Sequence, residues 1–161
     1  MESRVKLLGH AVHPILITFP LGLLTTSVIF DLLHVATGTP RWAEVAFWMM
    51  ASGVIAGLVA AVPGLIDWLS IPRNTRAFKI GMLHGGGNVI VVALFGASVL
   101  LRKDAPESPS TLAVALAVGG LGLAGITGWL GGELVERLGV GVDDRAGLDA
   151  PSSLSRRSAS P

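Results

Sequence analysis

Four long apolar segments, separated by short polar connections, dominate the pattern of the chain. They cover about residues 13–36, 45–69, 80–101 and 111–135. Each is long enough for the roughly 20 residues with which an α-helix crosses a bilayer, and none alternates like a barrel strand. The pattern therefore predicts an all-α protein, an integral membrane four-helix bundle.

The connections between the segments contain turn-forming residues. They read Thr37-Gly38-Thr39-Pro40, Ile71-Pro72-Arg73-Asn74 and Asp104-Ala105-Pro106-Glu107-Ser108-Pro109. Connections this short make consecutive helices antiparallel neighbours, so residues 1–142 are expected to form one four-helix domain. From residue 143 the chain is rich in Asp, Ser, Arg, Ala and Pro, which predicts a disordered tail over 143–161.

The distribution of basic residues predicts the orientation in the membrane. Nine lie on one side of a four-span chain: Arg4, Lys6, Arg73, Arg76, Lys79, Arg137, Arg145, Arg156 and Arg157. Three lie on the other side: Arg41, Arg102 and Lys103. Because Lys and Arg accumulate on the cytoplasmic side, both termini and the tail are expected in the cytoplasm.

The composition supports a lipid bilayer as the environment of the chain. Hydrophobic residues make up 51% of it and charged residues only 14%, against about 25% in soluble domains. A net charge of +1 without a basic aromatic stripe gives no reason to expect nucleic-acid binding. The chain has no cysteine, which excludes disulfides and cysteine-ligated iron–sulfur clusters. Since no catalytic motif is recognisable either, no catalytic residue is assigned and an enzyme acting alone is not expected.

Several polar residues share one depth, near the predicted cytoplasmic end of the spans. His13 opens the first span, Asp67 ends the second, His84 and Asn88 occupy the first turns of the third, and Glu133 ends the fourth. Ionisable residues at membrane depth usually face the interior of a bundle or a wet cavity. These side chains are therefore predicted to converge. At the opposite end, Asp31 and His34 are predicted to form a local pair at the outer surface.

Small residues mark the faces along which two of the helices pack. The second span carries the series Gly53, Gly57, Ala60, Gly64 and Asp67, and the fourth carries Gly122, Gly125, Trp129 and Gly132. The order of histidine followed by carboxylate also occurs twice, as His13 with Asp67 and as His84 with Glu133. This predicts a parallel internal repeat about an axis normal to the membrane.

Two cofactors fit these residue types. Haem b needs two imidazoles from neighbouring helices at one depth, which His13 and His84 would provide, with Asn88 on the same helical face as His84. A divalent metal ion would use His13, Asp67, His84 and Glu133. A purely structural interpretation stays open, with both carboxylates bonded to nearby arginines and the histidines serving only as hydrogen-bonding groups.

The motifs of the chain resemble those of a known family. They are Gly9-His10-Ala11-Val12-His13-Pro14, Phe19-Pro20-Leu21-Gly22, Gly64-Leu65-Ile66-Asp67-Trp68, Gly128-Trp129-Leu130-Gly131-Gly132-Glu133-Leu134-Val135 and Gly139-Val140-Gly141-Val142. They are similar to a family of bacterial four-span membrane proteins catalogued as a domain of unknown function. Related domains occur beside Rieske-type iron–sulfur domains, so the resemblance implies a redox neighbourhood by association.

These observations lead to three hypotheses about function. The first is a small redox-associated membrane subunit that binds haem or a metal through the histidine and carboxylate cluster. The second is a proton or ion conduit, or a small transporter, and the third is a structural partner subunit of a membrane complex. A redox membrane partner or a second copy of the chain is the expected protein partner.

Overall fold

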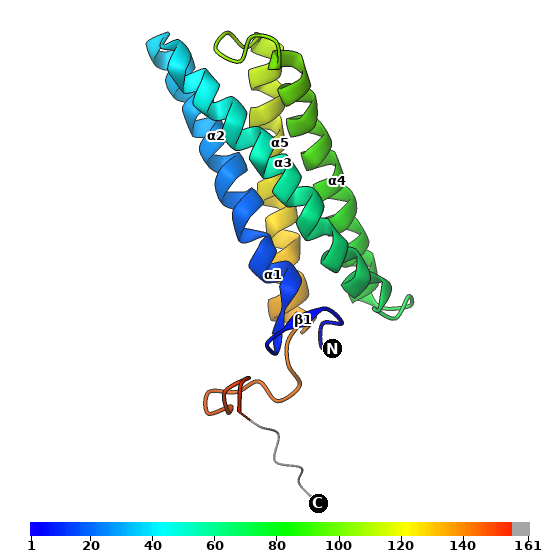
Figure 1. Ribbon diagram of the computed structural model, residues 1–161. Helices are drawn as coiled ribbons and strands as arrows, with labels where there is room; N and C mark the ends of the chain where they lie inside the picture. The colour runs from blue at the N-terminus through cyan, green and yellow to red at the C-terminus, as the bar shows by residue number, and fades with distance from the viewer. Residues whose placement is uncertain (156–161) are drawn as a thin grey trace, which may run out of the picture.

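The computed structural model describes residues 1–155, in which four spans pack as an antiparallel bundle (Figure 1). The elements in chain order are β1 (Lys6–Leu7), β2 (His10–Ala11), α1 (Val12–Leu16), α2 (Thr18–Thr37), α3 (Pro40–Leu69), α4 (Arg76–Arg102), α5 (Thr111–Gly132) and the π-helical turn η1 (Glu133–Arg137). All four spans are long and apolar enough to cross a membrane. The predicted all-α, four-helix membrane fold is confirmed.

The ends of the helices follow from local sequence signals. Gly38 ends α2 in the left-handed conformation, with φ of 67°, and Pro40 begins α3, where its missing N–H is not needed. The side chain of Thr75 accepts a hydrogen bond from the Phe78 amide at the start of α4, and Ser110 caps α5 in the same way. These signals keep the connections short and the helices antiparallel.

The first span is divided into two helices, which the apolar pattern did not predict. α1 ends at Leu16 and α2 begins at Thr18. Pro20 explains the break, because it has no N–H to donate to the carbonyl of Leu16 and its ring crowds that carbonyl. The backbone stays helical through Ile17, with φ of −65° and ψ of −17°, and the Ile17 amide donates to the carbonyl of His13 at 3.0 Å. The interruption is therefore a missing hydrogen bond at Pro20, one to two turns after His13.

A small hairpin precedes α1. β1 and β2 pair antiparallel, and Leu8 and Gly9 between them have φ of 51° and 86°. Two consecutive positive φ values are typical of the tight turns that join two-residue hairpins. The N-terminal segment and η1 lie at the same end of the bundle, which we call the histidine end (Figure 1). The opposite end, at the end of α4, is called the Arg102 end.

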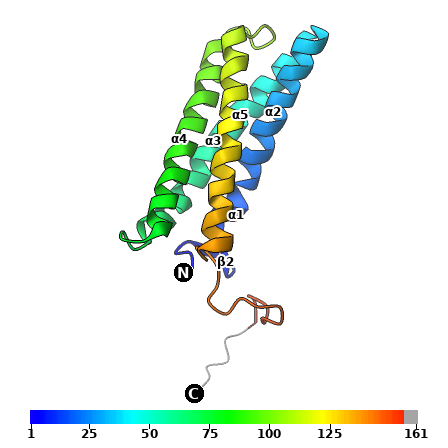
Figure 2. The same cartoon turned by 180° about the vertical axis from the view of Figure 1, so that it is seen from behind.

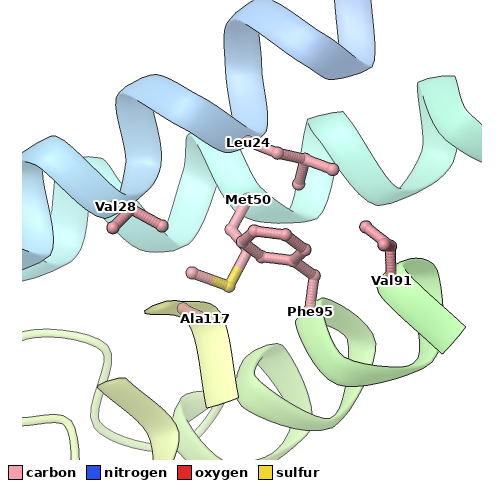
Figure 3. Close-up of a cluster of buried hydrophobic side chains, with 6 residues drawn as sticks. All are labelled: Leu24, Val28, Met50, Val91, Phe95 and Ala117. Atoms are coloured by element: carbon pink, nitrogen blue, oxygen red, sulfur yellow. The ribbon is translucent and has the colours of Figure 1, made fainter. Parts of the chain in front are cut away.

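The middle of the bundle is apolar. Six buried side chains from all four spans fill it: Leu24, Val28, Met50, Val91, Phe95 and Ala117 (Figure 3). Met50 and Phe95 have no exposed surface in the bundle. This layer separates the polar side chains of the histidine end from those of the Arg102 end.

The two halves of the chain have a similar arrangement of helices. α2 pairs with α3 and α4 pairs with α5 as two hairpins, seen from opposite sides in Figures 1 and 2. Positions 71 residues apart correspond in α1–α2 and α4: His13 and His84, Leu24 and Phe95, Ser27 and Ser98, Asp31 and Arg102. Positions 67 residues apart correspond in α3 and α5: Met50 and Ala117, Gly53 and Gly120, Ala60 and Thr127, Gly64 and Gly131.

Contacts support this correspondence. A Cβ on Gly53 would lie 2.7 Å from Leu24, and one on Gly120 would lie 2.9 Å from Phe95. Equivalent glycines therefore pack against equivalent side chains, as a parallel repeat requires. The repeat differs from the sequence prediction in one respect: Asp67 corresponds to Leu134, so Glu133 is not its equivalent.

The tail contributes little to the fold. Residues 143–155 contain turns but no helix or strand. Residues 156–161, also predicted to be disordered, lie outside the described residues. Disorder of the tail stays a prediction.

Candidate functional site

His13 projects from α1 toward α3 and is fixed there by a backbone carbonyl. Its Nδ1 lies 2.8 Å from the carbonyl oxygen of Ala60. Gly64, one turn further along α3, makes room for the ring, since a Cβ at Gly64 would lie 2.8 Å from both Cε1 and Nδ1 of His13. The small residues on this face of α3 therefore leave the space that the imidazole fills.

His84 repeats the arrangement in the second half of the chain. Its Nδ1 lies 2.8 Å from the carbonyl oxygen of Thr127 in α5. A Cβ on Gly131 would lie 3.0 Å from Cε1 of the ring. The glycine faces identified in the sequence thus have a specific role, because each admits one imidazole to a helix backbone.

The two imidazoles lie close together in the histidine end. Their ring centroids are 6.4 Å apart and their planes are perpendicular, at 90°. Both side chains are half-buried within the bundle. The structure therefore brings together the two histidines that the sequence singled out.

The hydrogen bonds define which nitrogen of each ring carries the proton. A carbonyl oxygen only accepts hydrogen bonds, so Nδ1 of both rings carries the proton and Nε2 has the lone pair. Metal-ligating histidines are usually fixed in this way, with the second nitrogen donating to a carbonyl. Within residues 1–155, Nε2 of His13 has no hydrogen-bond partner.

Asn88 contacts the ring of His84 and the backbone of the same residue. The amide nitrogen of Asn88 lies 3.5 Å from Nδ1 and 3.3 Å from Nε2 of the ring. Such similar distances place the amide over the ring face, because an in-plane position would clash with Cε1. The same nitrogen donates to the carbonyl of His84 at 2.9 Å, and Thr127 Oγ1 donates to Asn88 Oδ1 at 3.0 Å.

Asp67 is hydrogen-bonded to the N-terminal segment and not to either histidine. Its carboxylate accepts hydrogen bonds from Ser3 Oγ and from the backbone N–H of Arg4, both at 2.7 Å. Glu133 is occupied elsewhere as well, by Arg76 Nη2 at 2.6 Å. Both carboxylates lie at helix ends. The N-terminal segment binds one of them and Arg76 binds the other.

The predicted four-residue metal site is therefore not assembled. Within residues 1–155, no group of three or more His, Asp and Glu side chains lies close enough to hold one metal ion. The sequence placed all four residues at similar depth, but depth alone does not determine the direction in which a side chain points. The structural interpretation expected Arg73 or Arg137 as partners of these carboxylates. Glu133 pairs with Arg76 instead, and Asp67 binds Ser3 and the backbone amide of Arg4.

The prediction for Asp31 was wrong. Its carboxylate does not pair with His34; it accepts two hydrogen bonds from Arg102, at 2.7 and 3.0 Å, and both side chains are fully buried. Arg102 also donates to Ser98 Oγ at 2.9 Å. His34 instead contacts the carbonyl of Thr39, at 3.0 Å. Sequence analysis missed Arg102 because it was counted as a loop residue, although the repeat places it opposite Asp31.

The fold and the paired histidines define the class of the protein. It is a small multi-pass membrane protein built from two similar helical hairpins. Residues 9–144 match the model of the family described as "Predicted membrane protein (DUF2231)". The chain belongs to this family, whose function is unknown, and the resemblance found in its motifs is confirmed. Comparison with curated proteins and with solved structures finds no match.

Proposed function

We propose that His13 and His84 are the two axial ligands of a haem b iron, and that the protein is a small redox-associated subunit of the bacterial inner membrane. One observation carries the proposal: two half-buried imidazoles from different halves of the bundle lie with their ring centroids 6.4 Å apart, each with Nδ1 at a backbone carbonyl. Nε2 of His13 has no partner within residues 1–155, and Nε2 of His84 has only the Asn88 amide nitrogen, at 3.3 Å. A membrane redox partner would exchange electrons with this centre.

The separation of the rings is compatible with one metal ion between them. A metal–nitrogen bond of about 2.0–2.1 Å, with about 1.1 Å from Nε2 to the ring centroid, places two opposite imidazoles about 6.3 Å apart. The observed separation of the centroids is 6.4 Å. Two imidazoles on a tetrahedral ion would bring the centroids to about 5 Å, so a tetrahedral metal site fits less well.

The remaining ligands also favour haem over a bare divalent ion. A protein site for such an ion normally has at least three protein ligands, and no third His, Asp or Glu approaches the pair within residues 1–155. In haem the porphyrin supplies the other four nitrogens, so two histidines are sufficient.

A proton or ion conduit has less support. The six apolar side chains at the middle of the bundle separate the histidine end from the buried pair of Asp31 and Arg102 (Figure 3). A conduit requires polar groups or water along its whole length. If the experiment below finds no cofactor, the protein is a purely structural subunit of a membrane complex.

The experiment is an absorption spectrum and iron analysis of the protein, purified in detergent from cells supplied with iron and a haem precursor. We expect one haem per chain, with sharp α and β bands on reduction that are typical of two axial imidazoles. His13→Ala and His84→Ala should each lose the low-spin spectrum. His10→Ala and His34→Ala are matched controls and should keep it.

Two results would contradict the proposal. One is a protein without iron or haem in both the purified and the haemin-titrated sample. The other is a haem spectrum that survives both His13→Ala and His84→Ala, because the iron would then be held elsewhere.

A further inference from the structure

The outer face of α5 differs from the outer face of α3, although the repeat makes the two helices equivalent. On α3 this face carries four large apolar side chains, each between 54% and 64% exposed: Ile55, Leu58, Val62 and Leu65. The positions 67 residues later on α5 are Gly122, Gly125, Trp129 and Gly132. Lipid tails are as apolar as leucine, so the face of α3 suits contact with lipid. The face of α5 has glycine at three of the same four places.

These three glycines do not pack inside the chain. The sequence placed Gly122, Gly125 and Gly132 on a face along which helices pack, yet within residues 1–155 nothing lies within 4 Å of a Cβ built on any of them. Gly131 makes room for His84 inside the bundle and is not part of this face. α5 lies on the outside of the bundle, in front of α3 in Figure 2. The packing face that the sequence predicted on α5 is therefore open.

An open glycine face on a membrane helix is suited to contact with another helix. Glycine stabilises a helix less than leucine or isoleucine does and offers no side chain to lipid. Small residues let two helix backbones approach closely within a membrane. Among these glycines Trp129 projects from the helix and is 68% exposed. A large ring beside a flat glycine surface makes the face complementary to a second copy of itself, as a twofold contact requires.

Two charged residues continue this face beyond the end of α5. Glu136 and Arg137 are exposed, and within residues 1–155 neither takes part in an ion pair or a side-chain hydrogen bond. Together with Trp129, Gly132 and Glu133 they line an open cavity of about 340 Å³. In a parallel twofold contact, a residue on one flank meets the residue of the partner that lies on the other flank at the same depth. Glu136 of one copy would then meet Arg137 of the other copy, and the reverse.

We propose that two copies of the chain pair through this face of α5, about a twofold axis normal to the membrane. We call it the α5 face, and it consists of Gly122, Gly125, Trp129, Gly132, Glu136 and Arg137. The glycines bring the two α5 helices together within the membrane. Two symmetric ion pairs between Glu136 and Arg137 set their register at the histidine end. This inference goes beyond the proposed function and does not depend on the haem site.

The first test gives α5 the residues that α3 carries at the equivalent positions. Because the chain has no cysteine, a single cysteine at the exposed Ser108 takes a donor dye in one sample and an acceptor dye in another. Energy transfer between them in lipid vesicles, followed over a range of lipid-to-protein ratios, measures association. We expect Gly122→Ile/Gly125→Leu/Gly132→Leu to raise the dissociation constant of the dimer at least about ten-fold, because the two backbones no longer approach.

Matched controls come from glycines on other helices. Nothing lies within 4 Å of a Cβ built on Gly22 of α2 or on Gly86 of α4. Gly22→Leu and Gly86→Leu add the same kind of side chain outside the α5 face. Both variants should associate like the parent chain.

The charges give a second test that leaves the packing within the membrane unchanged. Glu136→Arg and Arg137→Glu should each weaken association with an identical copy, because like charges then meet across the axis. When the two variants are mixed, they should pair with each other at least about five-fold more tightly than either pairs with itself. The double variant Glu136→Arg/Arg137→Glu should associate like the parent chain.

Three results would overturn the proposal. The first is a parent chain that stays monomeric in vesicles at every lipid-to-protein ratio, and the second is an association that the triple glycine variant leaves unchanged. The third is equal pairing in mixed and unmixed samples of the two charge variants, which decides alone if circular dichroism shows that the triple variant is unfolded. None of these results bears on the haem site, which is tested separately by the absorption spectrum.

Discussion

Asp31 and Arg102 show how a fully buried ion pair is accommodated in an apolar bundle. The guanidinium binds both carboxylate oxygens, and Ser98 satisfies a further N–H. Arg102 Nε is buried without a hydrogen-bond partner within residues 1–155. Because charges in a membrane interior are costly, each member of the pair depends on the other.

Removing one member should therefore be more damaging than removing both. Asp31→Asn leaves a buried guanidinium without its counter-charge, and we expect a loss of about 3–5 kcal/mol in unfolding free energy. The double variant Asp31→Leu/Arg102→Met should lose less than either single change. Thermal unfolding in detergent measures this, with His34→Ala at the same end as the control. Single variants as stable as the parent would show that the pair contributes nothing.

Gly64 is the residue on which the position of His13 depends most directly. A methyl group there would lie 2.8 Å from the imidazole and force it to move. We expect Gly64→Ala to cost about 1–3 kcal/mol in stability and to reduce haemin binding. Gly128→Ala is a matched control, because nothing lies within 4 Å of its added Cβ. The prediction is wrong if both variants bind haemin like the parent chain.

At the level of the helices, the apolar pattern was sufficient to predict four spans, but it did not predict the interruption between α1 and α2. Hydrophobicity predicts how much of a chain lies in the membrane, whereas a break depends on one residue, here Pro20. The direction of a side chain at a helix end depends on neighbours from distant parts of the sequence. For that reason His13 and His84, inside the spans, were predicted to meet, while the partners of Asp67 and Glu133 were not identified.

The hydrogen bond that is missing at Pro20 leads to a prediction about backbone dynamics. Pro20→Val supplies an amide that donates to the Leu16 carbonyl, and amide hydrogen exchange in residues 17–20 should slow. Hydrogen exchange followed by mass spectrometry checks this. Pro14→Ala, in the first turn of α1, should leave the exchange of these amides unchanged, since first-turn amides have no partner within the helix. Unchanged exchange in Pro20→Val would mean that packing maintains the break.

For the whole molecule, the orientation in the membrane stays a prediction based on basic residues. The burial of Arg102 removes one residue from the outer count and leaves the bias toward the termini stronger. Single cysteines at Thr39 and Ser108 should react with an impermeant reagent added to intact cells, and one at Asn74 should react only after lysis. All three positions are exposed, so accessibility alone does not separate them. Labelling of Asn74 in intact cells would reverse the orientation.

The position of Asp31 opposite Arg102 also concerns the way in which the two hairpins recognise each other. Because these residues are equivalent in the repeat, a pairing of the first hairpin with a second copy of itself would bring two carboxylates together, and the second hairpin would bring two guanidinium groups together. Like charges at a buried contact are strongly unfavourable. The ion pair therefore makes the two halves complementary and not interchangeable, so that a fold with near-twofold symmetry has one permitted pairing.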